Sequence, residues 1–303
     1  MAHDADYLID RRRLKRSLFV WRAVAIVALV AAVAVWAGRF DGFYDGDYVA
    51  RLSINGIIFD DPWRQETLTR LKKDARAKAL IVQIDSPGGT VVGGEVLHRQ
   101  LRDIATDRPV VAVMGQVATS AGYMVAIGAD RIYARDGTIT GSIGVILQTT
   151  EVTGLLDKLG IKTEAIKSGP LKASPSPFEP MTDEVRRATQ RVVADIFALF
   201  VDMVAERRDI DRETVLALAD GRVLTGRRAL ADRLVDAIGG ESDAIEWLAK
   251  ERAISPDLPI RDVGQEDEIS RWLGNVSSLA RKVVFSERLS LDGLISVWHP
   301  SIR

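Results

Sequence analysis

Ser120 is the residue whose type and position first suggest chemistry. It lies in the stretch ATSAGYM (118–124), shortly after the apolar run VVAVM (110–114), and is predicted to begin a helix. A hydroxyl there is exposed, and the unpaired N–H groups of the first helical turn favour negative charge that develops nearby. A serine that only caps the helix occupies the same place, and the local sequence favours the cap. The GxSxG elbow is not matched, because Ala118 stands two residues before Ser120.

A reactive Ser120 needs a base, and histidine is scarce. A serine–histidine–acid triad would have to use His98, which stands alone in a predicted helix, where a surface or packing role is more common. A lysine can serve instead if burial disfavours its charged form. Lowering a lysine pKa from ~10.4 to near 7 takes roughly 4–5 kcal/mol. The segment 165–182 supplies Lys167 and Lys172, although most lysines are solvated surface charges.

A glycine pair is the third feature that could take part in chemistry. The apolar run ALIVQID (79–85) leads into SPGGTVVGG, so Gly88 and Gly89 follow a predicted strand, where ligand sites of parallel sheets gather. Consecutive glycines let backbone N–H groups approach a ligand, as an oxyanion hole requires. An ordinary tight turn between strand and helix explains the glycines equally well. The turn lacks the spacing of phosphate and dinucleotide loops.

Composition narrows the classes of function. The 41 basic and 42 acidic residues leave a net charge of -1, so nothing indicates a nucleic-acid partner. Cysteine is absent, which excludes disulfides, thiolate metal sites and cysteine nucleophiles. No two-histidine metal spacing exists, so no zinc or iron site is expected. With 303 residues and 47% hydrophobic content, the chain can bury a sizeable core.

The elements that must position these residues alternate along the chain. Strands are expected at 48–56, 79–85, 110–114 and 131–135, and helices between them at 61–76, 90–105 and 120–129. This alternation predicts an α/β fold with a largely parallel sheet covered by helices.

The second half of the chain reads as mainly helical. A long helix is predicted at 182–208, with shorter helical segments through Lys250 and a linker at 254–259. Beyond it, 267–285 places six apolar residues on one helical face: Ile269, Trp272, Leu273, Val276, Leu279 and Val283. This face could pack on the domain, which is the commonest explanation, bind a partner subunit or lie on the membrane.

The N-terminal part carries a targeting pattern. A basic run, RRRLKR (11–16), precedes an apolar stretch at 18–40, and acidic residues follow it. The stretch can cross a hydrocarbon core of ~30 Å at ~1.5 Å per residue. Positive charge on the inner side predicts a cytoplasmic N-terminus and an extracytoplasmic domain. A cleaved signal peptide remains the alternative, since Ala32, Ala34 and Ala37 could suit a signal peptidase.

Five motifs, in order, resemble those of one family. They are DSPGG (85–89), ATSAGYM (118–124), TGSIGVI (140–146), SGPLKASPSPFEP (168–180) and ADGRVLTGRRALADRLVDAIGG (219–240). They are similar to the motifs of signal peptide peptidase A, the serine-lysine peptidases of the S49 type. The resemblance covers about residues 48–250, and five motifs in order are far more specific than any one.

The resemblance implies a role for individual residues. Ser120 would be the nucleophile, and Lys172 matches the general-base lysine of the family's glycine-x-x-lysine motif. Ser142 corresponds to a serine or threonine that hydrogen-bonds this lysine and orients it. Gly88 or Gly89, together with the Ser120 amide, would form the oxyanion hole. No metal or organic cofactor is implied.

Some positions depart from the family or stay outside its motifs. Lys167 precedes the lysine motif and matches no catalytic position. Ala121 and Leu171 stand where many members have glycine and tyrosine, which puts substrate preference more in doubt than catalysis. Tyr123 and Met124 are expected to line an apolar pocket near the nucleophile and so to contact substrate.

The resemblance also implies an architecture and a setting. The fold would be ClpP/crotonase-like, with a peptidase domain at 46–255 between a cytoplasmic segment at 1–17, an anchor at 18–40 and an amphipathic tail at 256–303. The expected location is a bacterial plasma membrane, and the expected substrates are remnant signal peptides or other short membrane-associated peptides. Single-copy members close into rings, so a homo-oligomer is expected, with an octameric ring as one candidate.

Two other classes of function share parts of this pattern. In a crotonase-like acyl-CoA enzyme, the glycine turn would hold a thioester oxyanion and Ser120 would only cap its helix. An extracytoplasmic domain disfavours that reading, because acyl-CoA is cytoplasmic. In a non-catalytic membrane scaffold the motifs would be relics, which the joint presence of Ser120, Ser142 and Lys172 disfavours.

Overall fold

The computed structural model of the chain describes residues 18–31 and 46–264. The chain divides between Tyr48 and Val49 into two units. In the first unit, residues 18–31 form an exposed helix. No helix within the described ranges is both long and apolar enough to cross a membrane, so they do not support the predicted transmembrane helix at 18–40. Residues 1–17 and 32–40 of the predicted N-terminal segments, and the predicted helix at 267–285, lie outside the described residues.

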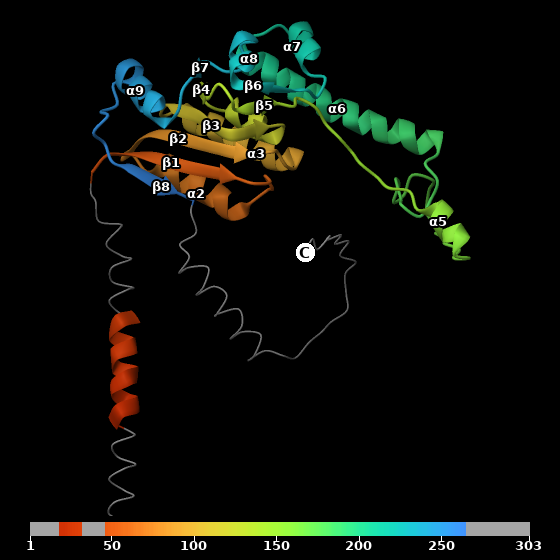
Figure 1. The fold of residues 1–303 in the computed structure, drawn as a ribbon, viewed down its shortest axis with the longest axis horizontal. Coiled ribbons are helices and arrows are strands. Elements are labelled where there is room, and N and C mark those ends of the chain that lie inside the picture. Colours follow the sequence, from red (N-terminus) through yellow and green to blue (C-terminus); the bar gives the residue numbers. More distant parts are fainter. Residues whose placement is uncertain (1–17, 32–45, 265–303) are drawn as a thin grey trace, which may run out of the picture. The chain divides into compact units, whose positions relative to one another are not determined.

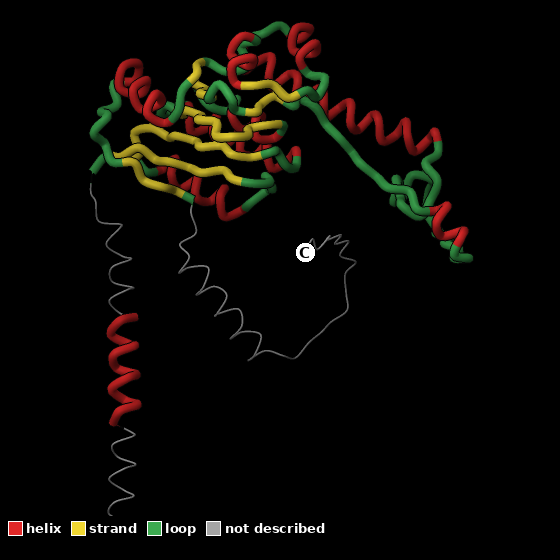
Figure 2. The backbone as a smooth tube through the Cα atoms, in the orientation of Figure 1, coloured by secondary structure: helices red, strands yellow, loops and turns green. Residues whose placement is uncertain are grey.

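The second unit is centred on an eight-stranded sheet, shown in yellow in Figure 2. Its strands are β1 (Tyr48–Asn55), β2 (Ala77–Ser86), β3 (Val110–Thr119), β4 (Arg131–Ala134), β5 (Ile139–Gly141), β6 (Val223–Thr225), β7 (Ala237–Ile238) and β8 (Ile260–Val263). The order across the sheet is β6-β5-β3-β2-β1-β8, with β4 beside β3 and β7 beside β4. Every described pair is parallel except β5 with β6, so the predicted parallel-sheet core is confirmed.

Eight helices of the second unit connect and cover these strands, and Figure 1 labels them except for α4. They are α2 (Pro62–Lys73), α3 (Val91–Ala105), α4 (Ala121–Ala126), α5 (Thr153–Lys158), α6 (Asp183–Arg208), α7 (Arg212–Leu218), α8 (Gly226–Ala231) and α9 (Glu241–Arg252). Side-chain caps fix where several of them begin. Asp61 accepts from Trp63 N at the start of α2, and Thr90 and Thr182 cap α3 and α6 in the same way.

The core lies on both faces of the sheet. Seven of the ten residues of β2 are buried, which is typical of a strand covered on both sides. On one face Ile81 and Val111 pack in a cluster with Ala244 and Leu248 of α9. Successive residues point to opposite faces, so Leu80, Val82 and Ile84 serve the other face, where α3 and α4 contact each other.

Two boundaries differ from the sequence prediction. β3 continues through 115–119, which was read as a loop, because it pairs with β5 beyond the point where its apolar run ends. β8 pairs with β1, and Leu258 and Ile260 pack against the core cluster. The folded unit therefore extends past residue 255, where the tail was predicted to begin.

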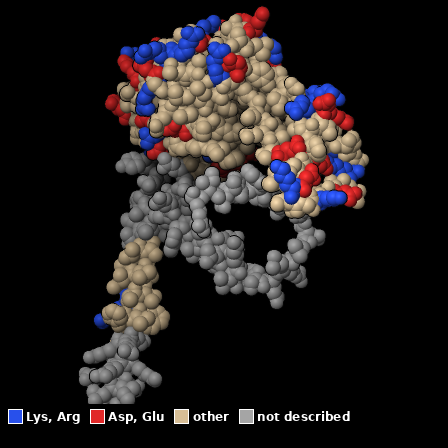
Figure 3. All heavy atoms as spheres, turned by 45° about the vertical axis from the view of Figure 1, so that its right-hand side comes forward, with Lys and Arg blue, Asp and Glu red and all other residues tan. Residues whose placement is uncertain are grey.

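The described surface mixes charges of both signs. On the face drawn in Figure 3, basic and acidic side chains are interspersed around a broad area without charge. Such a surface agrees with the near-neutral composition of the chain.

Candidate active site

The carboxyl ends of three strands bring the predicted site residues together. In the sheet register Ser86 of β2 lies opposite Ala118, and Thr119 lies opposite Gly141 of β5. The turn after β2, the corner after β3 and the residue after β5 are therefore neighbours. Each of the three carries part of the predicted site, at the sheet edge where parallel folds place their ligands.

Ser120 occupies the corner between β3 and α4 in a strained conformation. Its φ is 53° and its ψ is -120°, which a residue with a Cβ rarely adopts and which costs about 1–3 kcal/mol. Its N–H donates to Gly141 O at 2.9 Å, and its carbonyl accepts from Met124 N at 2.9 Å. The surrounding hydrogen bonds thus hold the corner in place.

The Ser120 hydroxyl does not cap the helix. Ser120 stands at the N-cap position of α4, but its side chain accepts no N–H of the first turn. Among the described residues the hydroxyl makes no other hydrogen bond either, and the residue is partly exposed. The cap that the local sequence favoured is therefore wrong, and the oxygen is left available for chemistry.

Gly88 lies directly against Ser120. Its φ is +113°, and a Cβ built there would lie 2.9 Å from Ser120 Cβ and 3.1 Å from Thr119 O. Only glycine fits this position without displacing the corner. Its own N–H donates to Ser86 Oγ at 3.1 Å, and its carbonyl accepts from Ile58 N at 2.9 Å.

The neighbouring Gly89 presents an N–H with no acceptor among the described residues. It forms a parallel bridge with Ile58, so close that a Cβ would fall 1.9 Å from Ile58 O. Of the two glycines that sequence could not separate, Gly89 has the available amide. Because Gly89 has no side chain, its backbone can lie this close to Ile58.

The second available amide belongs to Ala121. As the first residue of α4 it has no intrahelical acceptor, and a Cβ on Gly88 would lie 3.3 Å from its nitrogen. The Ser120 amide, which was expected to complete the oxyanion hole, is engaged by Gly141 instead. Gly89 and Ala121 therefore replace it as the pair of candidate donors.

Ser142 joins the same cluster, next to the Ser120 corner. It follows Gly141, whose carbonyl binds the Ser120 amide, and its own φ is 50°. Its N–H donates to Arg222 O at 2.8 Å, while its hydroxyl makes no hydrogen bond with the described residues.

Lys172 is not part of this cluster within one chain. The segment after β5 runs away from the sheet in Figure 1 and returns as α6. Lys172 is exposed there, and its ammonium group has no partner among the described residues. Lys167 differs, because it forms an ion pair with Glu179 and also lies 3.5 Å from Ser174 Oγ. Glu179 occupies the ammonium group of Lys167, whereas that of Lys172 is left available, which favours Lys172 between the two lysines.

His98 does not serve as a base for Ser120. Its ring is buried, and Nδ1 donates to Met124 O at 3.0 Å. Burial lowers the pKa of His98 to about 4, with Arg207 and Arg102 adding to the effect. It packs behind α4, as expected of a lone histidine in a helix.

A family model and a relative that matches most of the chain indicate one family. The pattern of peptidase family S49 matches residues 102–255. A protein of Synechocystis sp. with a provisional protease name is 39% identical over 235 residues, which is 76% of this chain and 84% of that protein. This chain belongs to peptidase family S49.

Other relatives carry more specific names. An Enterococcus faecium protein, provisionally named signal peptide peptidase SppA, is 34% identical over 242 residues, 75% of this chain and 70% of that protein. Among solved structures, a mutant of a membrane-bound stomatin-specific protease matches with a TM-score of 0.48 and 16% identity, over 73% of this chain and 99% of that one. That last likeness is too low to carry an inference.

Two expectations for the S49 site need correction. Tyr123 and Met124, predicted to contact substrate, are 0% and 2% exposed. Tyr123 donates its hydroxyl to Leu234 O at 2.9 Å, and burial raises the pKa of this phenol. Both side chains point into the core because α4 turns its apolar face inward, and neither can contact a peptide in this structure.

Sequence reasoning also missed the hydroxyls that build the S49 site. Ser86 holds the Gly88 amide, Thr119 Oγ1 donates to Pro87 O at 3.0 Å, and Thr140 Oγ1 donates to Ala118 O at 2.8 Å. Each of these hydroxyl residues stands at or next to the carboxyl end of an observed strand, and the sequence prediction missed two of them because it ended β3 early and did not include β5. Within the described residues, no cluster of three or more acidic or histidine side chains could hold a metal ion.

Proposed function

We propose that this S49 peptidase is a serine endopeptidase in which Ser120 is the nucleophile and Lys172 the general base. The observation that carries the proposal is the Ser120 corner. A strained, uncapped serine lies between the turn that holds the Gly89 amide and the helix start that holds the Ala121 amide. Strain held by a rigid network is typical of active sites, and no packing role explains it here.

The chemistry follows from those groups. Neutral Lys172 takes the Ser120 proton as the oxygen attacks the peptide carbonyl, and the oxyanion accepts hydrogen bonds from Gly89 and Ala121. The lysine then gives that proton to the departing amine, leaving an acyl-serine. Water, deprotonated by the same lysine, hydrolyses the ester. Ser142 would hydrogen-bond the lysine and orient it.

We infer that Lys172 reaches Ser120 from a neighbouring copy of the chain. The segment that carries it exposes large apolar side chains, among them Ile146 at 83%, Ile166 at 99% and Leu155 at 58%. A second copy that covered them would gain apolar burial and would withdraw the amine from water, which favours the neutral base. A closed homo-oligomer, such as an octameric ring, supplies such a neighbour at every site.

The substrates and the location belong to the same proposal. The apolar stretch at 18–40, with basic residues before it, supports a single anchor in a bacterial plasma membrane, with the peptidase domain outside. An enzyme held there meets short membrane-associated peptides, including remnants of signal peptides. The name of the Enterococcus relative agrees with this substrate class.

Three substitutions in the full-length chain, purified in detergent, test the proposal. Ser120→Ala and Lys172→Ala are each expected to lower cleavage of a fluorogenic peptide by about 10⁴-fold or more. Lys167→Ala, in the same segment but paired with Glu179, is the matched control and should retain activity within a few-fold. Full activity in Ser120→Ala would overturn the mechanism, and loss in Lys167→Ala alone would move the base to that residue.

A further inference from the structure

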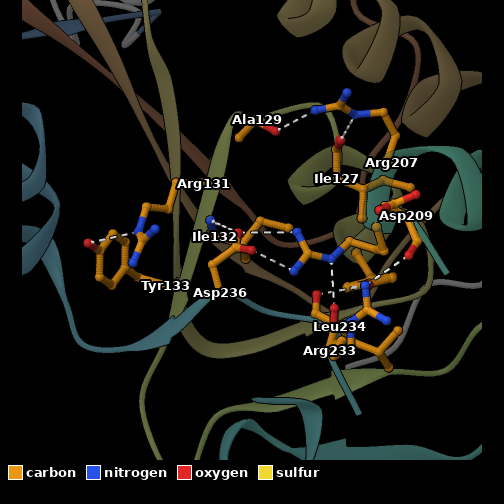
Figure 4. Close-up of polar contacts among 12 residues, drawn as sticks. Ile127, Ala129, Arg131, Ile132, Tyr133, Arg207, Asp209, Arg233, Leu234 and Asp236 are labelled. Atoms are coloured by element: carbon orange, nitrogen blue, oxygen red, sulfur yellow. Dashed lines mark hydrogen bonds and ion pairs between the residues drawn. The ribbon is translucent and has the colours of Figure 1, made fainter. Parts of the chain in front are cut away.

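Helix α4 is held at its C-terminal end by a residue of another helix. It has only six residues, too few to be stable alone, and the turn at 127–129 that follows it donates backbone N–H groups to its last carbonyls. Arg207, in the last turn of α6, donates from Nε to Ile127 O at 2.8 Å and from the guanidinium to Ala129 O at 3.0 Å. Figure 4 shows the side chain spanning both carbonyls.

Arg207 is well placed to fix the turn that follows α4. A cation at a helix C-terminus is favoured by the helix dipole, and a planar guanidinium holds two acceptors in fixed geometry. The carbonyls it binds directly follow α4, whose other end begins at Ser120 and Ala121. His98 adds one further bond, to Met124 O. Arg207 of α6 thus holds the turn that ends this short helix, and His98 of α3 holds one carbonyl within it.

We propose that Arg207 is a positioning residue for the nucleophile. By fixing the C-terminal end of α4, it sets the Ser120 oxygen and the Ala121 amide relative to the Gly89 amide. Errors of about 1 Å in such an arrangement can cost about 100-fold in rate. The inference rests on the proposed role of Ser120.

The same helix connects this contact to the base. α6 begins right after the segment that carries Lys172 and runs for 26 residues to Arg208. The N-terminal end of α6 therefore adjoins the segment that carries Lys172, and the C-terminal end of α6 contacts the turn after α4. Arg207 supplies the side-chain hydrogen bonds from α6 to the turn that ends α4.

Arg208 provides a matched control in the same helical turn. Its guanidinium makes a two-pronged ion pair with Asp236, at 2.7 and 3.1 Å, and its Nε donates to Arg233 O at 2.9 Å. Arg208 thus makes three hydrogen bonds from a largely buried site, none of them to α4. Its loss should cost stability without shifting Ser120.

The experiment compares Arg207→Met with Arg208→Met in the full-length enzyme, with Arg207→Lys as a rescue. Melting temperature, kcat and KM are measured with one fluorogenic peptide, at a temperature where every variant is folded. We expect Arg207→Met to lower kcat about ten-fold or more with KM within two-fold, since the reacting groups move while the peptide still binds. Arg208→Met should lower the melting temperature and leave kcat within two-fold, and Arg207→Lys should recover part of the kcat.

The kcat values of the arginine variants decide whether Arg207 positions the nucleophile. Equal kcat values in Arg207→Met and Arg208→Met would overturn the positioning role. If Arg207→Met does not fold, Arg207→Lys is compared with Arg208→Lys by the same criterion. Ser120→Ala separates the two proposals. If Ser120→Ala still cleaves the peptide, Ser120 is not the nucleophile. If Ser120→Ala is inactive and Arg207→Met leaves kcat unchanged, only the positioning role of Arg207 is refuted.

Discussion

At the scale of single residues, the site depends on backbone geometry more than on side-chain contacts. Ser120 is strained, Gly88 has a positive φ, and the two available amides come from Gly89 and Ala121. Hydroxyl groups of Ser86 and Thr119 hold the glycine turn against the corner. Preorganised N–H groups of this kind cost no reorganisation when charge develops.

The closeness of Gly88 to Ser120 gives a direct test. Gly88→Ala would force a Cβ to within 2.9 Å of Ser120 Cβ at a φ of +113°. We expect activity to fall about 100-fold or more, and stability to fall by about 1–2 kcal/mol from the backbone alone. Gly137→Ala is the control, because no atom lies within 4 Å of its Cβ position. Steady-state kinetics and thermal unfolding measure both, and near-native activity in Gly88→Ala would contradict the described corner.

The sequence could predict part of this site. Residue types and their places after strands singled out Ser120, the glycine pair and the lysine segment. It could not separate Gly88 from Gly89, because that choice depends on the bond from Gly88 N to Ser86 Oγ. It named the Ser120 amide as the second donor and could not show that this amide is engaged, because the bond from Ser120 N to Gly141 O joins residues 21 apart. The burial of Tyr123 and Met124 likewise depends on how α4 packs.

At the scale of elements, the sheet and α6 do most of the positioning. The strand and helix pattern predicted the parallel sheet, and it predicted the long helix with end points close to those observed. It did not predict β5, β6, β7 or β8. β8 was missed because its four residues follow a segment that looks like a linker, and only pairing with β1 identifies them as a strand. A short strand of this kind takes its stability from its neighbours.

The contact between α3 and α4 makes stability depend on pH through His98. The folded pKa of His98 is about 4, below its ordinary value of 6.5, so the unfolded chain binds more protons between those two values. The free energy of unfolding should therefore fall as pH drops from 6.5 to 4, by up to about 3 kcal/mol, and this loss should be absent above 6.5.

His98→Asn provides the comparison for that titration. The asparagine amide can stand in for Nδ1 as the donor to Met124 O and does not titrate in this range. Urea unfolding at pH 7 and pH 4.5 should show a smaller difference for the variant than for the native enzyme. Identical differences would mean that His98 does not contribute to the pH dependence.

At the scale of the whole molecule, one chain holds every proposed catalytic group but does not bring them together. Ser120, Ser142 and the glycine turn share one edge of the sheet, whereas Lys172 is exposed on the segment beyond it. The exposed apolar residues of that segment, such as Ile166, are the surface we expect a second copy to cover.

Sites shared between copies predict complementation. Ser120→Ala and Lys172→Ala subunits are each expected to be inactive, but subunits exchanged between them should regain activity. Random assembly pairs an intact Ser120 with an intact Lys172 at about one site in four, so about a quarter of native activity is expected. The control is a mixture of the two variants under conditions in which their subunits do not exchange. No recovery after verified exchange would mean that each chain supplies both groups itself.

The central claim, that Ser120 is the nucleophile, is tested most directly by locating a covalent adduct. The full-length enzyme is treated with a fluorophosphonate, which is attacked by activated serines, and the modified peptide is identified by mass spectrometry while residual activity is followed. We predict one adduct on Ser120 that forms in proportion to the loss of cleavage, with much slower labelling in Lys172→Ala. Inactivation with Ser120 unmodified and the adduct on another residue would contradict the account.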